Sequence, residues 1–298
     1  MAYEIRTFDL TAPQKIIPFL CTRLPLPQSE IIRLIDRGRV TVDGAAIVRK
    51  GEPVSGSVEV LFHVPSPTGL EPLFETPDFG VFDKPSGMLA HPNDFSVSAS
   101  VMDEARGRYG YHSNTVHRLD RETSGLMVVS RHKEAESALK LLFQNRYVQK
   151  RYRMVLRGRL SEAITVEAPI VPGKKGHGQE FVKIFSHISP LGKPAKTHFI
   201  PLFYDAASDT TLTEAVPYTG RTHQIRVHAH HIGHTILGDP VYGLEKADIE
   251  AYLEGRWDEA HRLKLTGASR LMLHAYALRF EYRQCVYRLT APSGLFGR

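Results

Sequence analysis

The chain has 298 residues and a formal net charge of +6, with 23% charged and 42% hydrophobic residues. These values are typical of a globular protein and exclude a mainly disordered, collagen-like or coiled-coil chain. Its two cysteines, Cys21 and Cys285, are too few for a disulfide framework or a cysteine-based zinc site. No apolar run approaches the roughly 20 residues that span a bilayer, and Met1 to Leu10 do not form a secretory signal. We therefore expect a cytoplasmic protein without a membrane partner.

Helices followed by a two-stranded ribbon are predicted near the N-terminus. A helix capped by Ser29 and ended at Gly38 is indicated by isoleucine and leucine at helical spacing between them. Val40 to Val42 alternate as a strand, and Asp43-Gly44 is typical of a two-residue hairpin turn before a second strand at 45–48. This pattern alone indicates a small α/β unit of no particular function.

A linker is predicted over residues 65–72. Pro65, Pro67, Gly69 and Pro72 fall within eight residues, and proline favours extended backbone and removes a hydrogen-bond donor. The linker would separate a small domain, residues 1–64, from a large domain, residues 73–298.

The large segment mixes strands and helices. Leu126 to Val129 are typical of a buried strand, and Glu134 to Tyr147 carry apolar residues at helical spacing, with Ser130 as the possible cap. Val148 to Leu156 alternate, which places Tyr152 on a mostly apolar face and several arginines on the other face.

Positive charge is concentrated in one stretch of the chain. Residues 146–196 contain 11 Lys and Arg against three acids, a local charge of +8, which leaves −2 for the rest. Such a band indicates a polyanionic partner, although a solvated basic face with no partner is the alternative. Residues 239–259 are rich in acids, and we do not expect a phosphate backbone to lie against them.

Asp120 is a candidate for chemistry because of its place in a polar run, His117 to Leu126. It precedes a Thr-Ser-Gly turn that leads into the predicted buried strand, so it lies on a loop at the end of a rigid element. Arg118 and Arg121 favour its ionised form. A helix cap or a surface ion pair is the alternative for such an aspartate.

A second polar run covers residues 219–228. It predicts a helix from a cap at Thr222 to an end at Gly233, with a strand at 224–228 as the alternative. Arg226 would then either face solvent or pair with a buried carboxylate. Five histidines lie between positions 223 and 234, but no acid stands among them in a ligand frame, so we expect no metal site.

Several short motifs in chain order resemble those of the RluA family of RNA pseudouridine synthases. They are Asp83-Lys84-Pro85-Ser86-Gly87, His91-Pro92, His117 to Leu126, Lys150-Arg151-Tyr152, Gly220 to His228, Gly238 to Gly243 and Leu273-His274-Ala275. The resemblance covers about residues 73–291, and residues 1–64 resemble an S4-type RNA-binding domain. It implies an α+β pseudouridine synthase fold with a mixed, mostly antiparallel central sheet, plus a small S4-like α/β-ribbon domain.

The resemblance also implies the reaction. Uridine in RNA is isomerised in place: the bond between ribose C1′ and N1 breaks, the uracil turns, and C5 joins C1′, without a cofactor or a metal. Asp120 matches the catalytic carboxylate, Arg226 matches the arginine that pairs with it, and Tyr152 matches the tyrosine that stacks on the target base. Whether Asp120 attacks C1′, attacks the base or abstracts a ribose proton stays open.

RNA is the expected partner of a monomeric enzyme. The target base should be flipped out of the RNA, with Arg121 filling the vacated position. Residues expected to contact RNA are His117, Arg118, Arg121, Lys150, Arg151, Arg221, Arg37 and Arg39. Large-subunit ribosomal RNA is the preferred substrate, because an S4-like domain in this family often accompanies it, and transfer RNA is the alternative. A non-catalytic RNA-binding protein and a hydrolase using Asp120 are less favoured.

Overall fold

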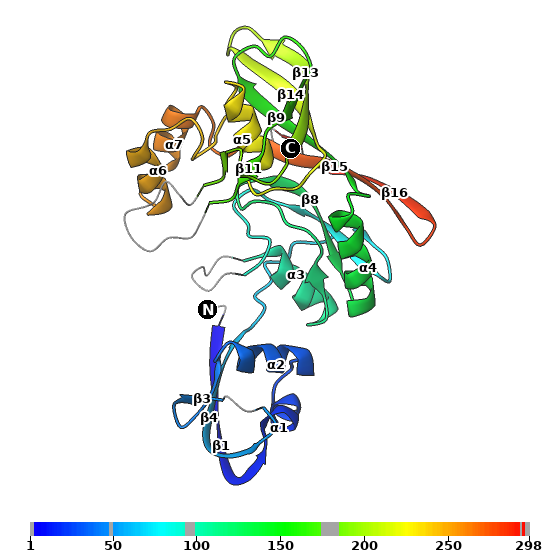
Figure 1. Cartoon of the computed structure of the whole chain (residues 1–298), viewed down its shortest axis with the longest axis vertical. Helices are drawn as coiled ribbons and strands as arrows, with labels where there is room; N and C mark the ends of the chain where they lie inside the picture. The colour runs from blue at the N-terminus through cyan, green and yellow to red at the C-terminus, as the bar shows by residue number, and fades with distance from the viewer. Residues whose placement is uncertain (1–2, 48–49, 93–98, 174–184, 293, 296–298) are drawn as a thin grey trace.

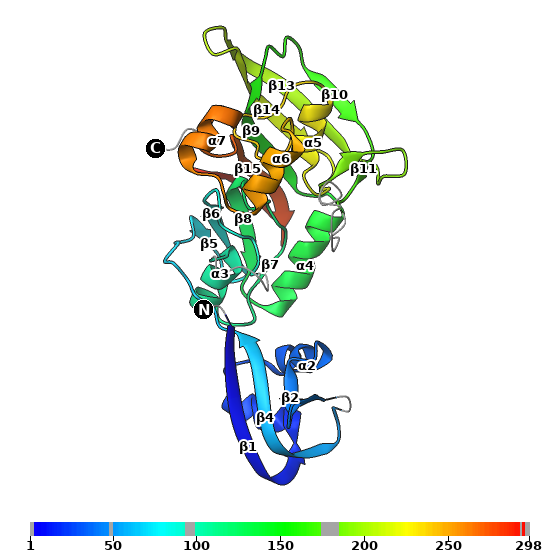
Figure 2. The same cartoon turned by 90° about the vertical axis from the view of Figure 1, so that its left-hand side faces the viewer.

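A computed structural model describes residues 3–47, 50–92, 99–173, 185–292 and 294–295. The chain forms a small N-terminal part and a larger part above it, each with its own sheet (Figures 1 and 2). The two parts have separate hydrophobic cores, the smaller one built from residues between Leu10 and Phe62.

The N-terminal part is a four-stranded antiparallel sheet covered by two helices. Its elements are β1 (Tyr3–Lys15), α1 (Ile16–Arg23), α2 (Gln28–Asp36), β2 (Val40–Val42), β3 (Ala45–Ala46) and β4 (Pro53–His63). The strand order is β1-β4-β2-β3. Ile31, Leu34 and Ile35 are buried on one face of α2, because residues three and four apart share a helix face.

The predicted hairpin is present between β2 and β3, and Asp43 and Gly44 both have positive φ, 47° and 80°, as a two-residue hairpin turn requires. One expectation was wrong: helix α2 begins after Pro27 and not after Ser29, and Pro27 makes no side-chain cap bond. Strand β1, paired with β4 over ten register positions, was not predicted. Val48, the last residue of the predicted second strand, lies outside the described residues.

The larger part combines a ten-stranded sheet with helices, and its elements follow in chain order. They are β5 (Phe74–Glu75), β6 (Phe79–Lys84), α3 (Val101–Tyr109), β7 (Asn114–Thr115), β8 (Ser124–Ser130), α4 (Lys133–Gln144), β9 (Gln149–Arg157), β10 (Ile164–Glu167), β11 (Ile170–Val171), β12 (His187–Ile188), β13 (Lys196–Asp205), β14 (Thr210–Pro217), α5 (Gln224–His231), α6 (Lys246–Leu253), α7 (Glu259–Thr266), β15 (Leu273–Tyr282) and β16 (Cys285–Thr290). Strands β11 and β12 pair separately.

The large sheet has the order β10-β13-β14-β9-β15-β8-β6-β5, with β16 beside β15 and β7 beside β8. Among the described strands, its pairs are antiparallel except β15 with β8. The mixed, mostly antiparallel sheet predicted from the sequence is therefore confirmed. At its centre, Ala275 of β15 pairs with Tyr152 of β9 on one side and with Gly125 of β8 on the other.

The predicted elements of this part occur with small shifts. The buried strand lies within β8, whose seven residues are all buried, and the alternating strand is β9. The helix after β8 begins at Lys133, and its cap is His132, whose Nδ1 accepts from the Ala135 N–H at 3.4 Å, so Ser130 is not the cap. The segment after residue 222 is a helix, α5, and not a strand, with His223 and not Thr222 as its N-cap.

Residues 64–72, which cover the predicted linker, contain no helix or strand but are bound to the larger part. The buried Glu104 of α3 accepts four hydrogen bonds from this segment, from the Thr68 N–H and hydroxyl, both at 2.7 Å, the Gly69 N–H at 3.2 Å and the Leu70 N–H at 3.1 Å. Next to it, Nε2 of His63 lies 3.1 Å from Oδ1 of Asp103. These contacts hold the connection between the two sheets against the N-terminal turn of α3.

Glu104→Gln tests this attachment. The glutamine amide keeps one acceptor oxygen, but its NH2 group replaces the other oxygen and faces backbone N–H groups of residues 68–70. Because these donors lose their acceptor, we expect the free energy of unfolding to fall by about 1–3 kcal/mol. Backbone amides of residues 68–70 should exchange with solvent faster. Chemical denaturation and hydrogen exchange measure both effects. Unchanged exchange at these amides would contradict the role of Glu104.

Candidate active site

A cleft of about 1090 Å³ opens on the large part of the molecule. Its walls come mainly from three segments: the loop at residues 116–123, the start of β9 and the chain from the end of β14 into α5. The carboxylate of Asp120, the phenol of Tyr152 and the guanidinium of Arg226 all line it. The three residues predicted to be catalytic are thus brought together in one concave site.

Asp120 is placed by the close approach of β8 to β15. Gly125, in β8, has φ +115°, and a Cβ at this position would lie 2.4 Å from the backbone oxygen of Ala275. Only glycine therefore allows the parallel pairing of the two strands. The turn before β8 closes with a hydrogen bond from the Thr123 N–H to the Asp120 carbonyl at 3.1 Å, and the Asp120 side chain remains 21% exposed toward the cleft.

Arg226 is a buried cation shared between two carboxylates. Its Nε and Nη2 each donate to Asp239 at 2.7 Å, in a bidentate arrangement, while its Nη1 lies 3.6 Å from Oδ2 of Asp120. The predicted ion pair between Arg226 and Asp120 is therefore present, through Nη1. The bidentate bond to Asp239 was not predicted, and it leaves the Nη1 edge of the guanidinium for Asp120.

Asp239 is held in turn by backbone groups. Its Oδ1 accepts from the N–H groups of Val241 at 2.9 Å and Tyr242 at 3.1 Å, and its side chain is 1% exposed. Burial raises its pKa, but the charge of Arg226 and these hydrogen bonds outweigh burial and lower the pKa below its usual value. Burial likewise lowers the pKa of Arg226, and Asp239 and Asp120 reverse this and raise it. Both groups therefore stay charged.

Helix α5 presents Arg226 because the loop before it is fixed by Gln224. The buried amide of Gln224 donates to the Lys196 carbonyl and the Thr197 hydroxyl, and its oxygen accepts from the Thr219 hydroxyl and the Arg221 N–H. All four bonds are 2.6–3.0 Å long. This amide thus connects β13 with the loop and sets the position at which α5 begins.

Tyr152 lies on the buried face of β9 and is 9% exposed. Burial, and to a smaller extent the charge of Asp120, raises the pKa of Tyr152 above its ordinary value, so its hydroxyl stays protonated. A neutral, rigidly placed ring beside a carboxylate provides an apolar surface on which a planar base can stack.

Lys84 holds the Asp120 loop from the opposite side. This fully buried lysine donates to the carbonyls of Pro85, Met88 and Arg121 at 2.9–3.0 Å. Burial lowers its pKa to about 7. The hydroxyl of Ser86 donates to the Glu122 carbonyl at 2.6 Å. The turn after β6 is thereby bound to the backbone that follows Asp120.

The helices α6 and α7 are also attached to this loop. Glu122 accepts from the Tyr252 hydroxyl at 2.8 Å and from Nη2 of Arg262 at 2.6 Å, and the same Nη2 donates to the Gly238 carbonyl at 3.0 Å. Burial raises the pKa of Glu122, but Arg262 and Tyr252 lower it further than burial raises it. Arg262 therefore connects Glu122, two positions after Asp120, with Gly238, which directly precedes Asp239.

The residues predicted to bind RNA lie in several places. Cleft-lining members of the set are His117, Arg118, Lys150, Arg151 and Arg221. His117 also stacks on Phe143 and accepts the Val128 N–H at 3.0 Å, and Arg151 donates to Glu214 at 2.7 Å.

Arg121 is not among the described residues that line the cleft, and its Nε donates to the Gly87 carbonyl at 3.1 Å. Arg37 and Arg39 lie in the N-terminal part, where Arg37 is exposed and Arg39 lies over the Tyr3 ring. Lys174, Lys175 and Lys183 of the basic band lie outside the described residues.

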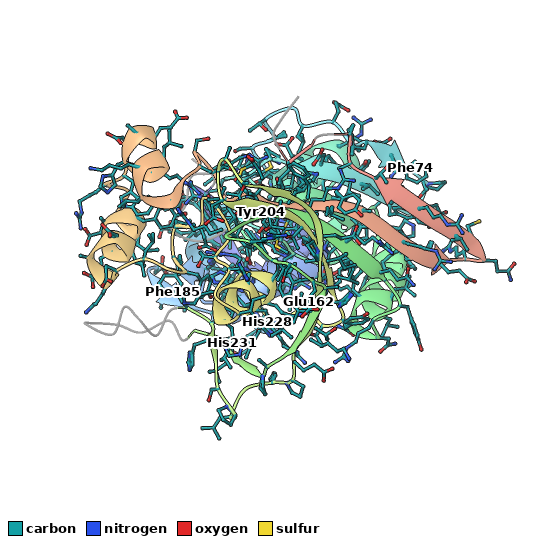
Figure 3. All side chains as sticks on the ribbon, turned by 90° about the horizontal axis from the view of Figure 1, so that it is seen from above. Phe74, Glu162, Phe185, Tyr204, His228 and His231 are labelled. Atoms are coloured by element: carbon teal, nitrogen blue, oxygen red, sulfur yellow. The ribbon has the colours of Figure 1, made fainter. Side chains whose placement is uncertain are left out.

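The described histidines do not gather into a metal site. His228 and His231 lie on α5, with Phe185 beside that helix (Figure 3). His228 is buried and bonded to the Thr197 hydroxyl and the Ala168 carbonyl. Among the residues that the structure describes, no group of three or more His, Cys, Asp or Glu side chains could hold a metal ion.

No helix in the described part of the chain combines the length and the apolar character that crossing a bilayer requires.

Comparison with known proteins identifies the family. Residues 78–231 match the family model of RNA pseudouridylate synthase. An RNA pseudouridine synthase of Helicobacter pylori strain J99, described as uncharacterized, is 32% identical over 98% of this chain and 96% of its own length. The chain belongs to the RNA pseudouridine synthase family. It is an enzyme of the isomerase class, and its substrate is RNA.

Other relatives agree with this assignment. The ribosomal large subunit pseudouridine synthase C of Pasteurella multocida strain Pm70 is 32% identical over 94% of this chain and 87% of its own length. Among solved structures, human RNA pseudouridylate synthase domain containing 1 matches with a TM-score of 0.58 and 27% identity, covering 78% of this chain and 86% of that chain. The fold predicted for the larger part is therefore confirmed.

Sequence reasoning missed four residues of this site. Asp239, His223, Glu122 and Arg262 all contact or support the loop and helix that carry Asp120 and Arg226. Asp239 lies in one of the motifs that carried the resemblance. Because a buried arginine is usually paired with an acid, that motif could have indicated Asp239 as the partner of Arg226. Nothing in the local sequence indicated that Arg262 lies near Glu122.

Asp239→Asn tests the dependence of the site on its buried ion pair. Removing one partner leaves a buried charge poorly compensated, so the free energy of unfolding should fall by about 3–5 kcal/mol. The released guanidinium should also turn toward Asp120 and lower kcat at least about tenfold. Chemical denaturation and tritium release from RNA labelled at uracil C5 measure the two effects. Asp248→Asn, in α6, is the matched control, and an Asp239→Asn enzyme with the kcat and stability of that control would contradict the prediction.

Proposed function

We propose that this enzyme isomerises specific uridines of large-subunit ribosomal RNA, with Asp120 as its catalytic carboxylate. The observation that carries the assignment of Asp120 is its position in the cleft: a half-buried carboxylate, 3.6 Å from a buried guanidinium that is itself bound to a second carboxylate. In this arrangement Arg226 orients Asp120 without forming a bidentate pair with it. One carboxylate oxygen thus stays available for the ribose or the base.

The chemical role of Asp120 is compatible with attack on C1′, attack on the base or abstraction of a ribose proton. Each of these steps needs an ionised carboxylate held close to the sugar. Asp120 would supply that group, Arg226 would fix its direction, and Tyr152 would stack on the uracil while the base is detached and turned. Such a reaction breaks the N1–C1′ bond and joins C5 to C1′. The hydrogen on C5 leaves as a proton, and N1 takes up a proton, so the composition of the nucleotide is unchanged.

The target uridine would enter the cleft by flipping out of its RNA helix or loop, which costs a few kcal/mol of unstacking. Arg118 is better placed than Arg121 to occupy the vacated position, because Arg118 lines the cleft and Arg121 is bound to Gly87. Lys150 and Arg221, also on the cleft wall, would contact phosphates next to the target and offset part of that cost.

Large-subunit ribosomal RNA is favoured as the substrate by the relatives. Proteins of Pasteurella multocida, Haemophilus ducreyi and Yersinia pestis that are 30–33% identical over 94–95% of this chain carry the name ribosomal large subunit pseudouridine synthase C. Their alignments include the N-terminal part, so the similarity is not limited to the catalytic fold. Transfer RNA is the alternative substrate, and a cytoplasmic location stays a prediction.

We also propose that residues 1–64 act as an S4-like RNA-binding domain, joined by residues 65–72 to a catalytic domain at 73–298. Support comes from the separate hydrophobic core of the N-terminal part and from the exposure of Arg37 at the end of α2, next to the β2–β3 hairpin. Phosphate contacts from such a domain would add affinity without touching the reacting nucleotide.

Asp120→Asn tests the catalytic assignment. Asparagine keeps the size of the side chain but lacks the charge, so tritium release from [5-³H]uridine-labelled ribosomal RNA should fall at least about a thousandfold, while RNA affinity stays within about tenfold. Asp248→Asn serves as the control. A variant at position 120 with near wild-type turnover would remove Asp120 from its role. Wild-type enzyme that releases tritium from transfer RNA alone would instead reassign the substrate.

Arg37→Ala tests the role of the N-terminal part. Loss of one phosphate contact should weaken RNA binding several-fold and reduce the slope of log K against log salt by about 1, with kcat unchanged. The matched control is Arg256→Ala, since Arg256 is also exposed but is paired with Glu254 in the acid-rich segment. Salt-dependent filter binding measures the slope. Equal slopes for the two variants would argue against RNA contact at Arg37.

A further inference from the structure

His223 occupies an unusual position in the site. It is the N-cap of α5 and has φ 56°, in the left-handed region that residues other than glycine rarely adopt. Its Nε2 lies 3.9 Å from Oδ2 of Asp120, and its side chain is 19% exposed toward the cleft. Non-glycine residues held in this conformation cluster at functional sites, where the surrounding structure fixes them.

The neighbours of His223 determine which ring nitrogen carries its proton. The Tyr242 hydroxyl donates its single hydrogen to the Ser186 carbonyl at 3.0 Å, because a carbonyl oxygen only accepts. Tyr242 must therefore accept at its second contact, which is Nδ1 of His223 at 3.0 Å. The proton of a neutral His223 is then on Nδ1, and Nε2 has a free lone pair.

The ring stays neutral mainly because it is buried, and the charge of Arg226 acts in the same direction. Burial and the nearby Arg226 lower the pKa of His223 to about 4, although Asp120 and Asp239 act in the opposite direction. A second aromatic side chain, Phe185, stacks on the imidazole with a centroid distance of 6.4 Å. The ring is thus fixed in orientation, with an acceptor nitrogen directed at the space beside Asp120.

Two acceptors, Nε2 of His223 and the Asp120 carboxylate, therefore line the cleft 3.9 Å apart. Among the described residues, Nη1 of Arg226 lies 3.6 Å from Asp120, but none donates a hydrogen bond to Nε2 of His223. This free acceptor suits a ligand that supplies a hydrogen-bond donor. Each candidate role of Asp120 holds the carboxylate close to the sugar, and within an RNA chain the ribose group that donates a hydrogen bond is its 2′-hydroxyl, because O3′ and O5′ are esterified. The uracil would lie instead against Tyr152.

We propose that Nε2 of His223 accepts a hydrogen bond from a ribose hydroxyl of the flipped uridine and thereby aligns the sugar with Asp120. This inference rests on the proposed catalytic role of Asp120. It makes His223 a substrate-binding residue of the reaction, with Tyr242 and Ser186 as the groups that select its tautomer.

Two amide variants separate this role from a structural one. Asparagine is tolerated at positive φ, and its amide reaches the place of Nδ1, so His223→Asn keeps the contact to Tyr242 but has no acceptor at the place of Nε2. Glutamine extends its amide oxygen to the place of Nε2, so His223→Gln keeps the acceptor and loses the contact to Tyr242. A purely structural histidine would be replaced best by asparagine, and a substrate-binding one by glutamine.

Tritium release and RNA affinity would be measured for the wild type and both variants. The substrate is [5-³H]uridine-labelled total RNA from cells that lack this protein, which contains ribosomal and transfer RNA, so the test does not depend on which RNA is the target. We expect His223→Asn to lower the rate at saturating RNA by about tenfold or more, with RNA affinity within about twofold of wild type, and His223→Gln to retain a higher rate than His223→Asn. Melting temperatures of both variants identify any loss of rate that comes from unfolding.

Wild-type turnover by His223→Asn, or a higher rate for His223→Asn than for an equally folded His223→Gln, would overturn the proposal. Neither result would bear on the assignment of Asp120, which Asp120→Asn tests separately. Conversely, tritium release confined to the transfer RNA fraction would change the proposed target and leave the role of His223 standing.

Discussion

The site depends on one buried guanidinium. Arg226 is 3% exposed, and burying a charge in this way is costly unless it is paired and hydrogen-bonded. Asp239 meets both requirements, with two bonds of 2.7 Å and backbone N–H groups on its own oxygen. Because Asp239 neutralises Arg226, Asp120 need not do so. Asp120 can then stay partly exposed in the cleft, oriented by Arg226 without forming a bidentate pair with it.

The rest of the structure keeps Asp120 at that distance. Its loop is bound on one side by Lys84, which is buried against three carbonyls, and on the other by Glu122, which is bound to Arg262. Gly125 brings β8 against β15, next to Tyr152 on β9. Separate elements thus converge on a segment of a few residues. Catalytic groups need to be positioned within a fraction of an ångström, and a loop attached at so many points has little freedom to move.

The sequence predicted the helices and strands and the three candidate catalytic residues better than it predicted the side chains that bind those residues. Periodicity located β8, β9 and the helices α4 and α5, and the resemblance selected Asp120, Tyr152 and Arg226. The caps were wrong, because His132 and His223 occupy N-cap positions where propensity favours serine or threonine. Of the two, His132 makes a side-chain cap bond and His223 does not. The pair of Arg226 with Asp120 was predicted, but the bidentate bond of Arg226 to Asp239 was not. Contacts such as Glu122 with Arg262 join residues 140 positions apart, and such pairs are created by the tertiary fold and leave no local pattern.

The connection between the two sheets has a consequence for how RNA is bound. Glu104 binds three consecutive residues of the predicted linker to α3. Helix α3 packs beside β6, which leads into the Lys84 turn, and beside β8, which follows the Asp120 loop (Figure 2). The N-terminal sheet is therefore held at a set distance from the cleft. If residues 1–64 bind RNA as proposed, an RNA must present its phosphates and its target uridine at that spacing. Selectivity would then come from the shape of the folded RNA, with the cleft itself reading a single nucleotide.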